Sequence, residues 1–457
     1  MKSREEKEIM SKQFSSQALW RHKEKLVSGS LITSMEGLRN KWRVFPLVRR
    51  PVGRTFYGAG KRLPFHPNDF YPFGESSKIT SAEEAEAALG ISEEWYGNCG
   101  ETNTGNKNPE DDGKPFFREG QAHIIDHDGD LISTQELIEE DPDFMIGEAT
   151  IEIAQDWFSE VTLPIYDKHF DPDRVLMDHR HNIKWEYYNF DPLNNKRPPT
   201  PDQHTTAIGY YPWVTPEMVL KALHEFGKGN SMELRRLQPH VLMPVGWGFA
   251  TPNGVDHAPT NYCTQEPQAR YDEHLLVEDK CGERDLSWDI AWSAVRNEDY
   301  SPEDRNWETV IEKTDWDLVT DPNFVKKHQC LPVLDQKRTE DGDGTVTWVI
   351  YGNIRGDQMA STQRIVIPPK GRHVLYHPSW SICHALQGQG NIGGMKMKFE
   401  PRARIGQLTY DRWFTPYKNA IAPEGIEVVN TSRTKDLVFK CTFGPNAFPD
   451  GEQPVLG

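Results

Sequence analysis

The chain has 457 residues, 36% of them hydrophobic, with 14 Trp, 35 Gly and 33 Pro, and a formal net charge of −17 at pH 7. This length allows roughly two or three domains. Abundant Gly, Pro and aromatic residues are typical of a β-rich protein with many turns. The acidic charge repels phosphate backbones and anionic lipid, so we expect neither nucleic acid nor a membrane as a partner.

Six cysteines are scattered along the chain, without a C-x-x-C motif or a dense disulfide framework. This pattern predicts reduced thiols in a cytoplasmic protein. The N-terminal segment MKSREEKEIMSKQ has no apolar core, and no later stretch is long and apolar enough to cross a bilayer.

The first half of the chain alternates between helical and extended patterns. Residues 1–45 are charged and predict an N-terminal arm or helix. A capping box from Ser81 to Glu84 predicts a short helix over 81–90, and a second helix is expected over 133–141. Between them, residues 98–120 are polar and predict a surface loop. Residues 148–192 interleave apolar and polar residues and predict strands.

A further helix is expected to begin at Thr215, which is placed as an N-cap before Pro216 and Glu217. Residues 239–265 return to strands and turns, and 283–328 predict loops with short helices that join two β bodies. An acidic, glycine-containing turn at 339–344 precedes the strand pattern TVTWVIY. The predicted units are therefore an arm (1–45), a first domain (46–282), a connection (283–335) and a C-terminal domain (336–457).

Two stretches carry the pattern of a metal site. His179 and His181 are separated by one residue, so on a strand their imidazoles lie on one side of the sheet. Glu186 follows on an expected adjoining strand, and His257 follows a predicted tight turn built by the P-N-G sequence at 252–254. Three imidazoles and a carboxylate suit one divalent metal, with Zn expected first and Mn, Fe, Co or Ni as alternatives.

The two stretches, DHRHNIKWEYY and GWGFATPNGVDHAPTN, resemble the paired motifs of the cupin superfamily. The second matches every fixed position of G-x5-P-x-G-x2-H-x3-N. The resemblance implies a mainly β protein built from two cupin barrels (double-stranded β-helix, or jelly-roll), with helical insertions.

The C-terminal domain repeats these motifs in altered form. It keeps His377, but Ser379 stands at the second histidine position, Cys383 or His384 at the glutamate position and Val428 at the last histidine position. We therefore expect a degenerate cupin barrel without metal there.

The first domain also resembles type I mannose-6-phosphate isomerase, through segments such as ISEEWYGN, DGDLISTQELIEEDPDFMIG and IGYYPWVTPEMVLKAL. The resemblance implies a metal-dependent aldose–ketose isomerase acting on a sugar or sugar phosphate. Lys184 and Glu266 are then candidates for proton transfer, and Arg270 for substrate orientation or anion contact. The expected partner is a small carbohydrate, and a homodimer is an allowed assembly.

Two other functions fit the same motifs. Three histidines and a glutamate also serve cupin oxidoreductases, such as an Fe dioxygenase or a Mn decarboxylase. A non-catalytic, sugar-binding protein with two cupin barrels is the third alternative. Metal content and oxygen dependence separate the first two. The intact ligand positions of the first domain argue against the third, and a buried dry core at His179 without a pocket would support it.

Overall fold

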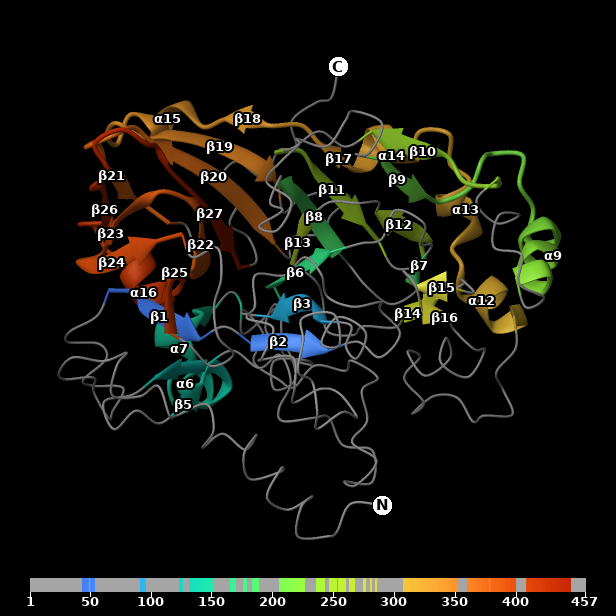
Figure 1. The fold of residues 1–457 in the computed structure, drawn as a ribbon, viewed down its shortest axis with the longest axis horizontal. Coiled ribbons are helices and arrows are strands. Elements are labelled where there is room, and N and C mark those ends of the chain that lie inside the picture. The colour runs from blue at the N-terminus through green and yellow to red at the C-terminus, as the bar shows by residue number, and fades with distance from the viewer. Residues whose placement is uncertain are drawn as a thin grey trace, which may run out of the picture.

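A computed structural model of the chain is mainly β, with antiparallel sheets and few helices, as the sequence predicts. It describes residues 43–48, 50–53, 91–95, 123–125, 131–148, 150, 165–169, 176–178, 183–188, 205–226, 236–242, 246–252, 254–259, 263–267, 274–276, 280–281, 284–285, 307–351, 360–377, 379–399 and 408–444. The described elements gather into two groups, here called the N-terminal body and the C-terminal body (Figure 1).

In the described residues, the N-terminal body contains two main sheets and four helices. The larger sheet has the order β17-β11-β8-β13-β6-β3-β2, and the smaller one has the order β10-β9-β12-β7-β14. The strands of the larger sheet are β2 (Arg50–Gly53), β3 (Ile91–Trp95), β6 (Ile165–His169), β8 (Ile183–Tyr188), β11 (Gly248–Thr251), β13 (Cys263–Pro267) and β17 (Gln329–Cys330). Those of the smaller sheet are β7 (Leu176–Asp178), β9 (Thr205–Ile208), β10 (His240–Leu242), β12 (His257–Pro259) and β14 (His274–Leu276). A separate pair is formed by β15 (Lys280–Cys281) and β16 (Arg284–Asp285).

The helices of this body follow the predicted signals. The longest, α9 (Pro216–Phe226), begins after Thr215 with proline at its first position. A hydrogen bond with the Thr215 side chain lowers the pKa of Glu217. Three short helices follow in the connection, namely α12 (Trp307–Lys313), α13 (Trp316–Val319) and α14 (Phe324–His328). Figure 1 shows α9, α12 and α13 at the end of the molecule farthest from the C-terminal body.

The C-terminal body consists of a nine-stranded and a four-stranded sheet. The nine-stranded sheet has the order β18-β19-β20-β27-β22-β25-β1-β4-β5, and the other has the order β21-β26-β23-β24. The large sheet contains β1 (Phe45–Val48), β4 (His123–Ile125), β5 (Leu131–Ser133), β18 (Val333–Leu334), β19 (Thr345–Ile350), β20 (Ser361–Ile367), β22 (Ser381–Gln387), β25 (Leu408–Thr415) and β27 (Leu437–Phe443). The small sheet contains β21 (Arg372–Leu375), β23 (Gln389–Ile392), β24 (Met395–Lys398) and β26 (Ile426–Asn430).

The core of the C-terminal body lies between these two sheets. Ile426 and Val428 of β26 are buried in it, while Glu427 between them is exposed, as the alternation of a strand requires. Trp413 and Phe439 reach the same core from the large sheet. One continuous apolar cluster therefore joins both sheets.

Strand β27 is buried along its whole length, because the large sheet also meets the N-terminal body. On that side the Thr442 hydroxyl donates a hydrogen bond to Oε1 of Gln265 on β13, over 3.3 Å. Four basic residues occupy one cross-strand row of the large sheet, in the order Arg412, His384, Lys440 and Arg364. The surface that β27 contributes to the contact between the bodies is therefore polar.

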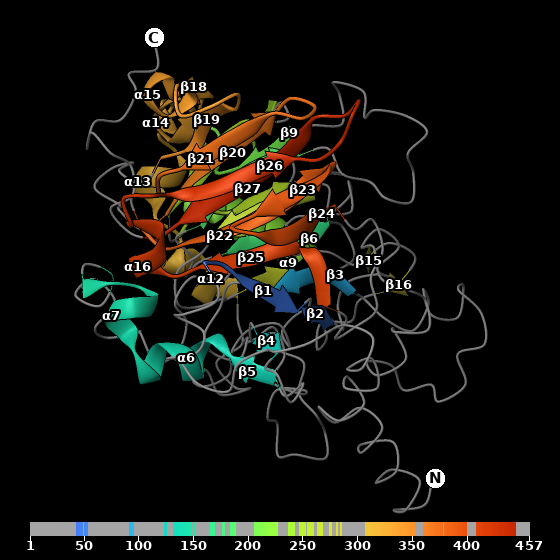
Figure 2. The ribbon, with the colours of Figure 1, turned by 90° about the vertical axis from the view of Figure 1, so that its left-hand side faces the viewer.

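The N-terminal segment closes the C-terminal body. Strand β1 pairs with β25, with Phe45 opposite Phe414, and β4 and β5 extend the sheet beyond it. Figure 2 shows β27, β22, β25 and β1 side by side in that order. Helices α6 (Thr134–Glu140), α7 (Pro142–Met145) and α16 (Tyr417–Ala420) lie near this edge, and α15 (Gln336–Thr339) lies near β18.

Several local predictions are confirmed. Helix α6 falls inside the predicted 133–141, and β19 coincides with the TVTWVIY pattern. The predicted turn at 339–344 contains Gly342, which forms an isolated bridge with His373. The helix expected over 81–90, the loop over 98–120 and residues 1–42 of the expected arm lie outside the described residues. In the described part of the chain, no helix is long and apolar enough to span a membrane.

Candidate metal centre

In the segment before His257, Gly254 has a backbone conformation that favours glycine. Gly254 adopts a positive φ of 78°, a conformation in which a side chain would be strained. Its carbonyl accepts a hydrogen bond from the backbone N–H of Asp315, over 2.9 Å, so the turn is held against the start of α13. His257 then begins β12, as expected for the second motif.

The imidazole of His257 is buried and oriented. Its Nδ1 lies 3.0 Å from the carbonyl oxygen of Val255. A carbonyl only accepts hydrogen bonds, so Nδ1 carries the proton and Nε2 is the basic nitrogen of the neutral ring. Histidines that bind metals commonly have this arrangement, in which a backbone carbonyl fixes the tautomer.

The strand that precedes the first motif pairs with the strand of His257. Strand β12 pairs with β7, and His257 lies opposite Leu176. Strand β7 ends at Asp178, directly before His179 in the sequence. His179 and His181 themselves lie outside the described residues. The backbone therefore brings the strand that precedes the H-x-H segment next to the strand that carries His257.

Lys184 and Glu186 are both on β8, in the larger sheet. Glu186 lies opposite Gly248 on one side and opposite Gln265 on the other, and Lys184 lies opposite Ala250. Gln265 reaches the C-terminal body through Thr442, so this row of the sheet borders the contact between the bodies. Glu186 and His257 thus come from different sheets of the N-terminal body.

Glu266 lies on β13, opposite Tyr166 of β6. Strand β13 also pairs with β8, so the strands that carry Glu266 and Lys184 are neighbours. Arg270 lies outside the described residues.

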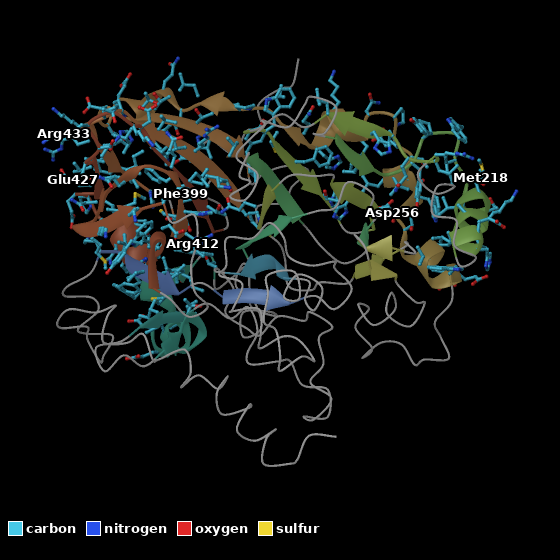
Figure 3. The ribbon with its side chains drawn as sticks, viewed as in Figure 1. Met218, Asp256, Phe399, Arg412, Glu427 and Arg433 are labelled. Atoms are coloured by element: carbon cyan, nitrogen blue, oxygen red, sulfur yellow. The ribbon has the colours of Figure 1, made fainter. Side chains whose placement is uncertain are left out.

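Next to His257, Asp256 is fully buried in the N-terminal body, where Figure 3 labels it. Its backbone carbonyl accepts a hydrogen bond from Gly209, over 2.7 Å. Burial, and then the Asp256 carboxylate, raise the pKa of Tyr210 well above its ordinary value. The Tyr210 hydroxyl therefore stays protonated beside a buried acid, and Trp316 stacks on its ring.

A second group of potential ligands lies inside the C-terminal body. His377, Cys383 and Cys441 are all buried, and one ligand atom from each lies within 4.8 Å of the others. His377 and Cys383 occupy altered motif positions that the sequence identifies. Cys441 was missed because pairing of β22 with β27 brings it opposite Cys383 from 58 residues away.

Comparisons with solved structures find distant similarities. No family model matches the chain, and no curated protein sequence matches it. A mannose 6-phosphate isomerase from Bacillus subtilis is 11% identical, with a TM-score of 0.47 over 87% of this chain and 99% of that one. A variant of the phosphomannose isomerase from Salmonella typhimurium is 9% identical, with a TM-score of 0.48 over 88% of this chain and 100% of that one. Likenesses this distant assign neither a family nor an activity.

Proposed function

We propose that this chain is a metal-dependent aldose–ketose isomerase that acts on a sugar or a sugar phosphate. Its metal ligands would be His179, His181, Glu186 and His257. The observation that carries the proposal is His257, which is buried after the predicted turn, with its ring oriented by the Val255 carbonyl. The complete second motif and the resemblance to type I mannose-6-phosphate isomerase support it.

The described imidazole of the proposed site, His257, suits a divalent ion. The Val255 carbonyl engages Nδ1 of His257, which makes Nε2 the basic nitrogen, and this is the tautomer that metal-binding histidines commonly have. The pairing of β12 with β7 supports a contribution from the H-x-H segment, since that segment follows β7 directly. Imidazole and carboxylate donors together suit Zn²⁺, with Mn²⁺, Fe²⁺, Co²⁺ and Ni²⁺ as alternatives.

Isomerisation moves one proton between C1 and C2 of the sugar through an enediol. A bound divalent ion supplies Lewis-acid stabilisation of the negative charge that develops on the substrate oxygens. In this proposal Lys184 or Glu266 takes the carbon-bound proton and returns it to the adjacent carbon. Gln265 lies opposite Glu186, so Lys184 and Glu266 belong to opposite faces of the sheet, and one active site uses only one of them. Arg270 orients the substrate or contacts its anionic group.

Replacement of His257 tests the assignment. We expect His257→Ala to lose the metal of the N-terminal body and to reduce isomerase activity by roughly 100-fold or more, since metal stabilisation amounts to several kcal/mol. Elemental analysis and a coupled assay on a panel of aldoses and their phosphates measure both effects. The matched control is His240→Ala, because His240 is exposed on β10 of the same sheet. Unchanged metal content in His257→Ala would remove the assignment.

Oxygen dependence separates this function from its alternatives. Turnover of an aldose under anaerobic conditions by the Zn-loaded protein supports an isomerase, because a dioxygenase consumes O₂. Product formation that requires O₂ supports a cupin oxidoreductase instead, and loss of CO₂ from an acid supports a decarboxylase. Sugar binding without any turnover supports the non-catalytic alternative.

A further inference from the structure

The interior of the C-terminal body contains two thiols on neighbouring strands. Cys383 on β22 lies directly opposite Cys441 on β27, and their sulfur atoms are 2.9 Å apart. Both residues are fully buried between the two sheets. Their side chains therefore meet inside the core and not on the face turned toward the N-terminal body.

His377 completes this cluster from the segment between β21 and β22. Its Nδ1 lies 2.8 Å from the Ser381 hydroxyl oxygen, and that oxygen lies 3.9 Å from Sγ of Cys383. Among the described residues, none forms a hydrogen bond with Nε2 of His377, although this atom is buried. A buried polar atom without a partner is unfavourable, so the site calls for a further group.

Metal binding changes the protonation of these side chains. Cysteine binds a metal as the thiolate and histidine as the neutral imidazole, so a metal must displace the thiol protons. On binding, two S–H bonds break, two metal–sulfur bonds form, and two protons pass to solvent.

We propose that His377, Cys383 and Cys441 bind one Zn²⁺ ion inside the C-terminal body. Two thiolates and a neutral imidazole balance the charge of the ion, which suits an apolar core. In a tetrahedral zinc site with bonds of about 2.3 Å the sulfur atoms are about 3.8 Å apart. The two sulfurs therefore need to separate by less than one ångström. The fourth position is open to water or to the Ser381 hydroxyl.

The surroundings favour zinc over a disulfide. A bond between Cys383 and Cys441 would use only two of the three grouped donors, whereas a metal ion uses all three. The ring of Phe443 packs edge-on against His377, with centroids 5.0 Å apart, and holds the imidazole in place. The histidine and carboxylate positions of the motifs alone predict a barrel without metal. Cys441 lies outside these positions, on β27, and supplies a further donor.

Cobalt substitution tests the proposal on the full-length reduced protein. We expect Co²⁺ to produce the charge-transfer absorption of thiolate coordination, and Zn²⁺ to abolish it by competition. The ligands proposed in the N-terminal body include no cysteine, so this signal is independent of the proposed isomerase site. If the cobalt absorption appears in a protein that has no isomerase activity, the zinc site is supported and the proposed function is not.

Variants assign the signal to these residues. Cys441→Ser and His377→Gln should each lose about one equivalent of tightly bound metal per chain and most of the cobalt absorption. Cys330→Ser is the matched control, because Cys330 is equally buried but lies on β17. Far-UV circular dichroism establishes that each variant folds. The cobalt titration of the wild-type protein tests the proposal even where a variant fails to fold. Absence of the absorption in the reduced wild type, or its survival in both ligand variants, would overturn the proposal.

Discussion

The buried histidine His373 shows how a single titratable residue links pH to the stability of the C-terminal body. Its Nδ1 accepts a hydrogen bond from the backbone N–H of Gly344, over 3.2 Å. Burial lowers its pKa, and the negative charges of Asp341 and Asp343 oppose that effect. The folded state therefore favours the neutral ring, and protonation would remove the acceptor that Gly344 uses.

The sign of the pH effect follows from the lowered pKa. The contribution of His373 is present above the ordinary histidine pKa and is lost as pH falls toward the folded value, by at most about 1.4 kcal/mol per pH unit. We expect the urea midpoint of the wild type to fall between pH 7 and pH 5, and His373→Gln to show a smaller fall. His240→Gln, at an exposed site, should keep the wild-type slope. Equal slopes for wild type and His373→Gln would contradict the prediction.

At the scale of elements, three aspartates cap short helices with the same hydrogen bond. Asp141, Asp315 and Asp335 each accept a bond from a backbone N–H three residues later. Asp335 does more, because its second oxygen accepts bonds from the Trp348 indole (2.8 Å) and the Arg338 guanidinium (2.7 Å). It therefore joins α15 to β19 in addition to capping a helix.

This difference predicts unequal effects of the same substitution. We expect Asp315→Ala to destabilise by about 1 kcal/mol, the usual effect of losing an N-cap. Asp335→Ala should destabilise by roughly 3–5 kcal/mol, because it also leaves a partly buried guanidinium and an indole N–H without their partner. Chemical denaturation followed by tryptophan fluorescence measures both. Similar midpoints for the two variants would show that the buried contacts of Asp335 add little.

Local rules explain which elements were predictable. The start of α9 is signalled by two adjacent residues, Thr215 and Pro216. The turn before His257 is likewise signalled locally, by Gly254, which has a positive φ. The partner of Cys383 could not be predicted, because the pairing of β22 with β27 depends on the whole sheet. The same holds for the contact of Gln265 with Thr442, which joins residues 177 positions apart. The ligand set of the N-terminal body stays a prediction.

At the scale of the whole molecule, the N-terminal segment is part of the C-terminal core. Phe45 and Leu47 of β1 are fully buried in a cluster that includes Trp380 and Phe414. Arg43 adds an ion pair with Glu424 and donates to the carbonyl of Gly425 over 3.0 Å. The C-terminal body therefore depends on residues from the other end of the chain.

Shortening Phe45 tests this dependence. We expect Phe45→Ala to destabilise the C-terminal body by roughly 3–5 kcal/mol, the usual effect of truncating a buried phenylalanine. Ile421→Ala is the matched control, since Ile421 is 44% exposed and should change stability by at most about 0.5 kcal/mol. Thermal unfolding and limited proteolysis report both. A Phe45→Ala protein as stable as the control would show that β1 contributes little to the core.

The pairing of β1 with β25 also sets an order of events during synthesis. The ribosome makes Phe45 first, but its partner Phe414 emerges only after 368 further residues have been translated. Until then β1 can pair only with β4 on its other side, and its edge toward β25 stays open, so a nascent chain must keep that edge from other partners. Completion of the C-terminal body therefore comes long after β1 has been made.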